Sequence, residues 1–237
     1  LAGINAALQV HGKEPWYPRR SEAYIGVMVD DLLTRGTTEP YRMFTSRAEY
    51  RLLLREDNAD LRLTEIGYRL GCVDENRFKI FSAKRNAIEN EKSRLRDIWI
   101  RPNTPAGEVF SALTQQQCER EYRVLELLRR PELNYMKMVE HGFITADVIP
   151  EVFEQIEIQM KYHGYIERQL LEIERYGRNE ETKIPPDFDY DLIKNLSNEV
   201  RQKLKKQHPV TIGQASRISG VTPAAISVLL VYLKKNR

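Results

Sequence analysis

Residues 74–100 read DENRFKIFSAKRNAIENEKSRLRDIWI, and their large apolar side chains recur at spacings of three, four and seven. An α-helix turns once every 3.6 residues, so side chains at these spacings line one face. The sequence therefore predicts one long helix, which Pro102 and Pro105 end. The predicted apolar stripe consists of Phe78, Phe81, Ile88, Leu95 and Trp99.

A second long helix is predicted over residues 146–178, followed by a break at Pro185 and Pro186 and by short helices near 197–207, 211–219 and 223–235. Alternating strand patterns are few. We predict a mainly α fold, a helical bundle with two long helices and a small C-terminal three-helix module. The predicted buried face of the second long helix is Ile149, Val152, Phe153, Ile156, Met160, Ile166, Leu170 and Ile173.

Composition and charge indicate a soluble globular protein with a basic end. Of 237 residues, 41% are hydrophobic and 30% charged, and the net charge is +3. Residues 198–237 hold eight basic residues and one acidic residue, so this tail carries +7 and the rest of the chain −4. A basic tail favours contact with phosphate, although a solvated helical face is the plain alternative. There is no long apolar run and no signal peptide, which favours a cytoplasmic location.

Residues 36–64 concentrate polar groups: five arginines, six acidic or amide side chains and two tyrosines. Arginine suits planar, bidentate contacts with phosphate or carboxylate. This block therefore predicts either a polar surface for an anionic partner or a structural salt-bridge network. Within it, Ser46 and Glu49 fit a capping box that opens a short helix through Leu54. Another short helix starts at Thr64 and is stopped by Gly71.

Aromatic residues alternate with arginines in the same block. Such an arrangement can stack a nucleobase and clamp its phosphate, while the alternative is that the leucines pack and the arginines pair with Glu49, Asp57 and Asp60. The aromatic side chains are Tyr41, Phe44 and Tyr50, and the arginines are Arg42, Arg47, Arg51 and Arg55.

A third basic group lies in the second predicted long helix. Lys161, Tyr165 and Arg168 are spaced four and three apart and would share one face. Gly164 would permit close approach of a backbone or a ligand, and a tight helix crossing is the structural alternative.

The sequence pattern of the tail is typical of a helix-turn-helix. Thr222 would cap the last helix and Pro223 would occupy its first position. The side chains exposed on that helix lack the arginine, asparagine or glutamine usual for reading bases, so we favour a tri-helical fold over operator recognition. These side chains are Ala224, Ala225, Ser227 and Val228.

The sequence shows no complete active site and no metal-ligand spacing. Cys72 and Cys118 are far apart, the four histidines are scattered, and no glycine-rich phosphate loop occurs. Residues 1–8 read as the end of a helix without an initiator methionine, so we expect a fragment of a larger protein.

Three stretches, residues 36–64, 161–169 and 212–233, resemble the C-terminal part of the tRNA uridine 5-carboxymethylaminomethyl modification enzyme, the GidA/MnmG family. The run EPYRMFTSRAEYRL at 39–52 is the most specific match, and residues 3–8 look like the last helix of the family's FAD-binding domain. The implied domains are 1–22 (end of that helix and linker), 23–186 (helical domain) and 187–237 (basic helical module).

The resemblance implies that the full-length protein binds FAD, uses NADH, forms a homodimer and acts with a GTPase of the MnmE family on the wobble uridine of tRNA. No catalytic role passes to Cys72 or Cys118, and neither cofactor is expected on this fragment. The alternative function is an assembly module that binds only the GTPase or the second subunit. The residues expected to contact tRNA are Arg42, Arg47, Arg51, Arg55, Lys161, Tyr165, Arg168, Lys203, Lys205, Lys206 and Arg217.

Overall fold

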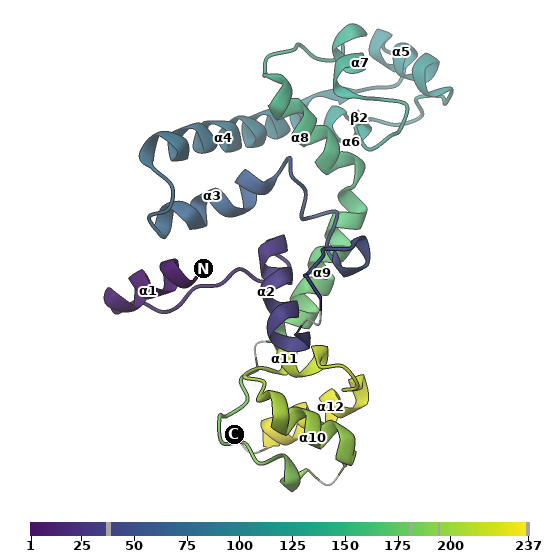
Figure 1. Ribbon diagram of the computed structural model, residues 1–237. Helices are drawn as coiled ribbons and strands as arrows, with labels where there is room; N and C mark the ends of the chain where they lie inside the picture. The colour runs from purple at the N-terminus through teal and green to yellow at the C-terminus, as the bar shows by residue number, and fades with distance from the viewer. Residues whose placement is uncertain (37–38, 181, 194, 236–237) are drawn as a thin grey trace. The chain divides into compact units, whose positions relative to one another are not determined.

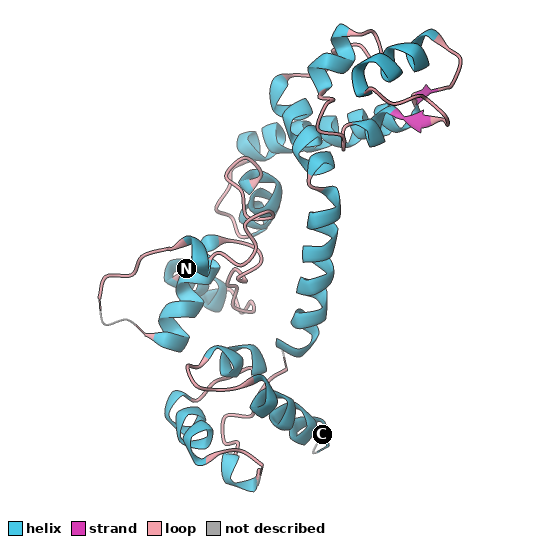
Figure 2. Cartoon of the chain, turned by 90° about the vertical axis from the view of Figure 1, so that its right-hand side faces the viewer, coloured by secondary structure: helices cyan, strands magenta, loops and turns pink. Residues whose placement is uncertain are grey.

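The computed structural model describes residues 1–235 except 37–38, 181 and 194. Helices dominate the described chain, and its strands form one small two-stranded sheet (Figure 2). The chain divides into two compact units, residues 52–167 and residues 1–51 together with 168–237. This division by packing differs from the boundaries expected after residues 22 and 186, which stay predictions.

The unit of residues 52–167 is built around α4, the long helix predicted from residues 74–100. Asp74 caps α4 by accepting a hydrogen bond from the Arg77 amide at 2.8 Å. Next to it lies α3 (Figure 1). The elements of this unit are α3 (Ala59–Arg69), α4 (Glu75–Asp97), β1 (Trp99–Ile100), α5 (Pro105–Thr114), β2 (Tyr122–Arg123), α6 (Val124–Leu127), α7 (Tyr135–Glu140), α8 (Pro150–Lys161) and the start of α9 (His163–Glu180).

The predicted stripe of α4 is confirmed at its centre. Phe81, Ile88 and Leu95 are buried, and Ile88 and Leu95 belong to the core that α5 to α8 complete. Phe78 instead stacks on Tyr68, with ring centroids 4.0 Å apart. The prediction for residue 99 was wrong: its side chain is 42% exposed, because the helix ends at Asp97 and this tryptophan lies in β1.

The second long helix was also predicted wrongly, because the structure has two helices, α8 and α9, separated at Tyr162. This residue adopts φ −99° and ψ 9°, which ends α8, and its carbonyl accepts the amides of Tyr165 and Ile166 at 3.0 and 2.9 Å, which starts α9. Val152, Ile156 and Met160 are buried as predicted.

Two residues of the predicted buried face are exposed. Ile149 is 60% exposed because it precedes the helix, whose first residue is Pro150. Leu170 is 50% exposed because it lies beyond the break at Tyr162, on α9.

The other unit ends in the predicted three-helix module, which has its own core of residues from 184 to 233. Thr222 accepts a hydrogen bond from the Ala225 amide at 3.3 Å, and Pro223 is the first residue of α12, both as predicted. The elements of this unit are α1 (Ala2–Val10), α2 (Tyr24–Arg35), η1 (Thr45–Arg47), most of α9, η2 (Tyr190–Leu192), α10 (Asn198–Gln207), α11 (Ile212–Arg217) and α12 (Pro223–Lys235).

The capping box at Ser46 and Glu49 was a wrong prediction. Only the 3₁₀ turn η1 forms there, without a side-chain cap, since the Glu49 carboxylate is held by Arg20. The helix expected to start at Thr64 starts at Ala59 instead, and Gly71 follows it with φ 76°. Among the described residues, no helix is both long enough and apolar enough to cross a membrane.

Candidate nucleic-acid interface

A buried arginine organises the polar block from its amino-terminal side. Arg20 is 8% exposed and donates to the Glu49 carboxylate through two nitrogens, at 2.6 and 3.0 Å. Its remaining terminal nitrogen donates to Asp31 at 2.8 Å and Asp30 at 2.9 Å. We call these four residues the Arg20 cluster. Because Asp30 and Asp31 lie on α2 and Glu49 follows η1, the cluster ties the block to that helix.

Electrostatics keep Arg20 ionised. Burial alone disfavours the charged guanidinium, but the hydrogen bonds that Arg20 donates to Glu49 and Asp31 outweigh it and raise the pKa of Arg20 above its ordinary value. A buried cation with three carboxylates at hydrogen-bond distance is a stable anchor for the surrounding loop. The cluster is therefore structural, which fits the salt-bridge interpretation of part of the block.

Arg47 lies against the aromatic side chains with which it alternates in sequence. Its guanidinium carbon is 5.0 Å from the Tyr41 ring centroid and 5.9 Å from that of Phe44. The Tyr41 hydroxyl donates to Asp31 at 3.0 Å, and burial together with this carboxylate raises the pKa of Tyr41. The stacking predicted for a nucleobase is thus made within the chain by Arg47 itself.

Arg42 and Arg51 differ from Arg47, and we call them the exposed arginine pair. Both side chains are exposed, and neither forms an ion pair with a described residue. The remaining arginine of the predicted set, Arg55, belongs to the other unit, where it pairs with Asp57 at 3.0 Å. The predicted set of four therefore divides into one half-buried, one paired and two exposed guanidiniums.

The cations of the tail differ in whether they have a carboxylate partner. Lys203 pairs with Glu199 at 2.6 Å, and these contacts lower the pKa of Glu199. Lys205 hydrogen-bonds Asp191, which likewise lowers the pKa of that carboxyl. Lys206 is exposed without an ion pair to any described residue.

Arg217 is largely withdrawn from solvent. Its side chain is 16% exposed, and its terminal nitrogens donate to Asp30 and to Glu180, each at 2.9 Å. It was expected to contact tRNA, and in the structure its guanidinium joins α11 to α2 and to the end of α9.

Lys161, Tyr165 and Arg168 do not share one helix, because α8 ends at Lys161 and the other two lie on α9. The Lys161 ammonium donates to the carbonyl oxygens of Arg130 and Leu133, and burial lowers its pKa. Tyr165 and Arg168 are exposed. A Cβ on Gly164 would have no described atom within 4 Å, so the close helix crossing expected there does not occur among the described residues.

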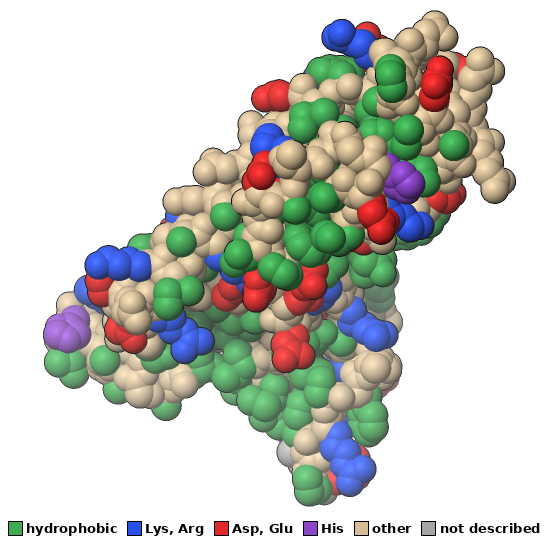
Figure 3. All heavy atoms as spheres, turned by 90° about the horizontal axis from the view of Figure 1, so that it is seen from above, with side chains coloured by type: hydrophobic (Ala, Val, Ile, Leu, Met, Phe, Trp, Pro, Cys, Tyr) green, Lys and Arg blue, Asp and Glu red, His purple; other side chains and the backbone are tan. Residues whose placement is uncertain are grey.

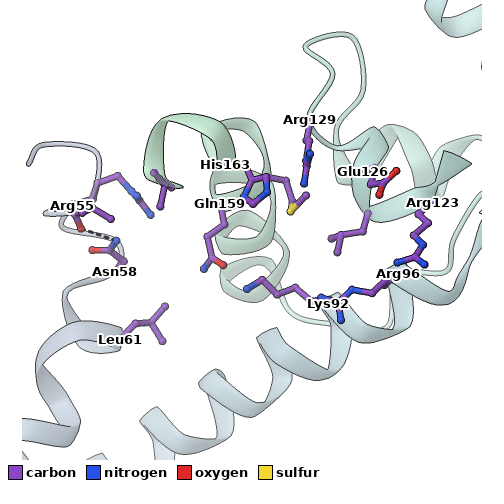
Figure 4. A pocket seen from close by; sticks show the side chains of 14 residues that line it. Arg55, Asn58, Leu61, Lys92, Arg96, Arg123, Glu126, Arg129, Gln159 and His163 are labelled. Carbon is purple, nitrogen blue, oxygen red and sulfur yellow. Dashed lines mark hydrogen bonds between the residues drawn. The ribbon is translucent and has the colours of Figure 1, made fainter. Parts of the chain in front are cut away.

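The sequence interpretation missed a basic pocket in the unit of residues 52–167 (Figure 4). Its volume is about 490 Å³, and basic side chains reach it from four segments. Lys92 and Arg96 are four apart on α4, the one signal that sequence spacing offered. The basic residues that line the pocket are Arg55, Lys92, Arg96, Arg123, Arg129 and His163.

One face of the molecule carries both signs of charge. On the face drawn in Figure 3, Lys and Arg side chains are interspersed with Asp and Glu rather than gathered in one continuous basic field. An anion that approaches this face would therefore meet small groups of cations rather than a continuous basic surface.

Helix-starting glycines and clusters of metal-ligating side chains are the features that would hold a phosphate or a metal ion. A Cβ on Gly3 or Gly164, at the starts of α1 and α9, would meet none of the surrounding described atoms within 4 Å, whereas a Cβ on three other helix-starting glycines would meet the chain's own atoms at 2.4 to 3.0 Å. These are Gly26, Gly107 and Gly213. No group of His, Cys, Asp and Glu among the described residues has the arrangement of a metal site.

Two family models match the chain. The C-terminal helical domain of the tRNA modifying enzyme MnmG/GidA matches residues 75–170, and the C-terminal helical bundle of the same enzyme matches residues 172–237. Structures of Aquifex aeolicus GidA in crystal forms II and I share 46% sequence identity with the chain, with TM-scores of 0.80 and 0.78.

These structures cover 98% of this chain, while the chain covers 36% and 35% of theirs. The chain thus spans about a third of the length of these solved relatives. The helical fold, the two family models and the sequence identity agree, and the chain belongs to the MnmG/GidA family, as its C-terminal helical region.

Proposed function

We propose that this chain is the docking region, for tRNA and for a protein partner, of an FAD-dependent enzyme that installs a carboxymethylaminomethyl group on the wobble uridine of tRNA. Family membership supports the tRNA-modifying class. The observation that carries the docking role is the exposed arginine pair, Arg42 and Arg51, on a loop that the Arg20 cluster holds to α2. Exposed guanidiniums on an anchored loop suit phosphate because their donors match it bidentately and the backbone that carries them is already held in place.

The flavin and NADH chemistry is assigned to the part of the enzyme outside these 237 residues. Both family models that match this chain describe C-terminal helical domains, which supports that division of labour. What these residues contribute is binding and orientation of the RNA. The cytoplasm, where tRNA is modified, is the corresponding location.

The proposed partners are tRNA, a GTPase of the MnmE family and a second copy of the enzyme. Lys203, Lys205 and Lys206 of α10 are the proposed tail contacts with RNA phosphate, although the first two have carboxylate neighbours. Tyr165 and Arg168, exposed on α9, extend the proposed RNA surface.

A second candidate function is a pure assembly module. An apolar hollow in the tail favours it, because Leu192 and Val231 are 60% and 67% exposed at its rim. In that case the tail binds protein only, and the affinity of the tail contact does not depend steeply on salt.

The test uses the intact enzyme that contains this chain. Arg42→Glu combined with Arg51→Glu is expected to weaken binding of labelled tRNA about tenfold or more, measured by fluorescence anisotropy, and to reduce the salt dependence of the affinity. The matched control is Arg69→Glu with Arg77→Glu, which changes the charge equally at two exposed sites of α3 and α4. Unchanged tRNA affinity in a folded Arg42/Arg51 variant, with binding of the GTPase retained, would overturn the assignment of RNA docking to the exposed arginine pair.

A further inference from the structure

The basic pocket is assembled from segments that are distant in sequence but belong to one unit. Figure 4 shows Lys92 and Arg96 on α4, Arg123 on the same side as Arg96, Arg129 above them, and Arg55 and Asn58 across the opening. Gln159 and His163 come from α8 and α9. The volume of about 490 Å³ lies within the range of roughly 300–1,000 Å³ typical of small-ligand sites.

The cations in the pocket are not balanced by carboxylates. Five arginine and lysine side chains line it, whereas Glu126 is its one acidic residue. Arg96 and Arg129 are exposed and form no ion pair with any described residue. Arg123 lies over the Trp99 ring, 4.8 Å from its centroid, and also lacks a carboxylate partner among the described residues. Three guanidiniums are therefore available to an anion.

The two other cations are already neutralised. Arg55 pairs with Asp57 at 3.0 Å and Lys92 pairs with Glu89 at 3.1 Å. These pairs fix the walls of the pocket and leave its open charge on Arg96, Arg123 and Arg129.

The rest of the lining is apolar with one uncommitted amide. Gln159 forms no hydrogen bond with a described residue, so its donor and acceptor face the pocket unused. Asn58, by contrast, is occupied, because it donates to the Leu53 carbonyl and accepts from Arg62. The apolar wall consists of Leu53, Leu61, Leu125, Met160 and Ile166.

This combination defines the ligand. Three arginines demand an anion with several oxygen acceptors, an apolar wall accepts a flat or aliphatic group, and an amide recognises a group with both a donor and an acceptor. A metal cation is excluded by the positive charge. A nucleotide has all three features in one unit, and its phosphate offers more oxygen acceptors per site than a peptide carboxylate.

We propose that this pocket binds one nucleotide of an RNA chain, with its phosphate on Arg96, Arg123 and Arg129 and its base against the apolar wall beside Gln159. The inference rests on the proposed function, since that function supplies RNA as the polymer. It adds a second contact point, in a different unit from the exposed arginine pair.

The first experiment removes charge from the pocket of the intact enzyme. Arg96→Gln with Arg129→Gln is expected to lower tRNA affinity about tenfold and to reduce the slope of log K against log salt by about 1. The control, Arg69→Gln with Arg77→Gln, loses the same charge from the same unit outside the pocket and is expected to change neither quantity. Circular dichroism and thermal melting establish that both variants are folded.

A neutral variant keeps the proposal testable if the double variant fails to fold. Gln159→Ala is expected to weaken tRNA binding about threefold to tenfold while leaving the salt slope unchanged, because no ionic contact is removed. ATP and hexaglutamate are the competing probes. ATP carries a phosphate and a base, so any affinity it has for this pocket is expected to fall together with that of tRNA in the Arg96/Arg129 variant, whereas the affinity of hexaglutamate is expected to stay unchanged.

The outcomes separate this inference from the proposed function. If the Arg42/Arg51 variant loses tRNA and the Arg96/Arg129 and Gln159 variants do not, the pocket assignment is overturned and the docking role stands. If the pocket variants lose tRNA and the Arg42/Arg51 variant does not, the nucleotide site stands and the exposed pair has no role. A loss confined to ATP, or to hexaglutamate, would reassign the pocket to a free nucleotide or to an acidic protein segment and overturn the RNA proposal.

Discussion

Arg217 of α11 donates to Asp30 of α2 at 2.9 Å across 187 positions of sequence. Asp30 also accepts a hydrogen bond from Arg20 at 2.9 Å, so one carboxylate lies between two guanidiniums. The side chains of Asp30 and Arg217 are only 15% and 16% exposed. The tail module is therefore joined ionically to the helix that also anchors the polar block.

We expect Arg217→Ala to loosen α11 from α2 without unfolding the tail. The tail keeps its own apolar core, and Asp30 keeps Arg20 as a partner, so the loss of stability should be about 1–3 kcal/mol rather than the larger cost of leaving a buried charge alone. Hydrogen–deuterium exchange should rise at α11 and α2 together. Exchange that stays unchanged in both helices would show that the ion pair contributes no stability.

The Arg20 cluster gives a test of geometry at constant charge. Arg20→Lys keeps a cation but cannot donate to Glu49 through two parallel nitrogens while also reaching Asp30 and Asp31. We expect the variant to lower the free energy of unfolding by about 2–4 kcal/mol in urea titrations, because the buried Asp31 and the half-buried Asp30 each lose a partner.

The control for this test is Lys13→Arg, a conservative exchange at an exposed cation of the same unit, which should leave stability within about 0.5 kcal/mol of the parent. An Arg20→Lys protein as stable as the control would mean that charge alone, and not the forked geometry, holds the loop.

These contacts explain which predictions from sequence succeeded. The helix of residues 75–97 and the tail module were predictable because their signals are local: apolar spacing, an Asp or Thr cap, and a proline at the first helical position. The capping box failed since Glu49 is taken by Arg20, 29 positions away, and no local pattern reveals a distant competitor.

The candidate sites, like the fold, could be predicted from the sequence only in part. The sequence identified the arginine-rich block, but it could not tell exposed Arg42 from Arg47, which lies against Tyr41, because both follow the same alternation with aromatics. The basic pocket escaped detection because α4 contributes only two of its cations, and the others come from segments that the fold brings together.

A buried tyrosine predicts alkaline sensitivity. Tyr135 is fully buried, and its hydroxyl donates to Glu91 at 2.8 Å. Burial and then this carboxylate raise the pKa of Tyr135 to about 12, against about 10 for an unfolded tyrosine. Between these pH values the folded state keeps a proton that the unfolded state loses, so stability is present below about pH 10 and falls as pH rises toward 12, by on the order of 2 kcal/mol.

Tyr135→Phe isolates this contribution. Lys161, whose pKa is lowered by burial, acts in the opposite direction at alkaline pH but is common to both proteins, so the difference between their pH–stability curves belongs to the tyrosine. At neutral pH the variant should be about 1–2 kcal/mol less stable because Glu91 loses one of its partners while Arg94 remains. If the pH–stability curves of the parent and of the Tyr135→Phe variant ran parallel from pH 9 to 12, the alkaline loss of stability would not come from Tyr135.

Two glycines predict opposite effects of one added methyl group. In α2, a Cβ on Gly26 would lie 2.4 Å from the Arg19 carbonyl oxygen and 2.6 Å from that of Pro18. Neither backbone oxygen can move without displacing the turn that leads into α2, so Gly26→Ala should cost about 2 kcal/mol or more.

At Gly164 in α9, the added carbon would meet no described atom within 4 Å, and Gly164→Ala should stabilise the protein by up to about 1 kcal/mol, since alanine loses less backbone entropy in a helix. Thermal melting of the Gly26→Ala and Gly164→Ala variants measures both changes in stability. If Gly164→Ala were destabilising while tRNA binding also fell, the glycine would instead serve the close approach of a ligand, for which the space beside it is open.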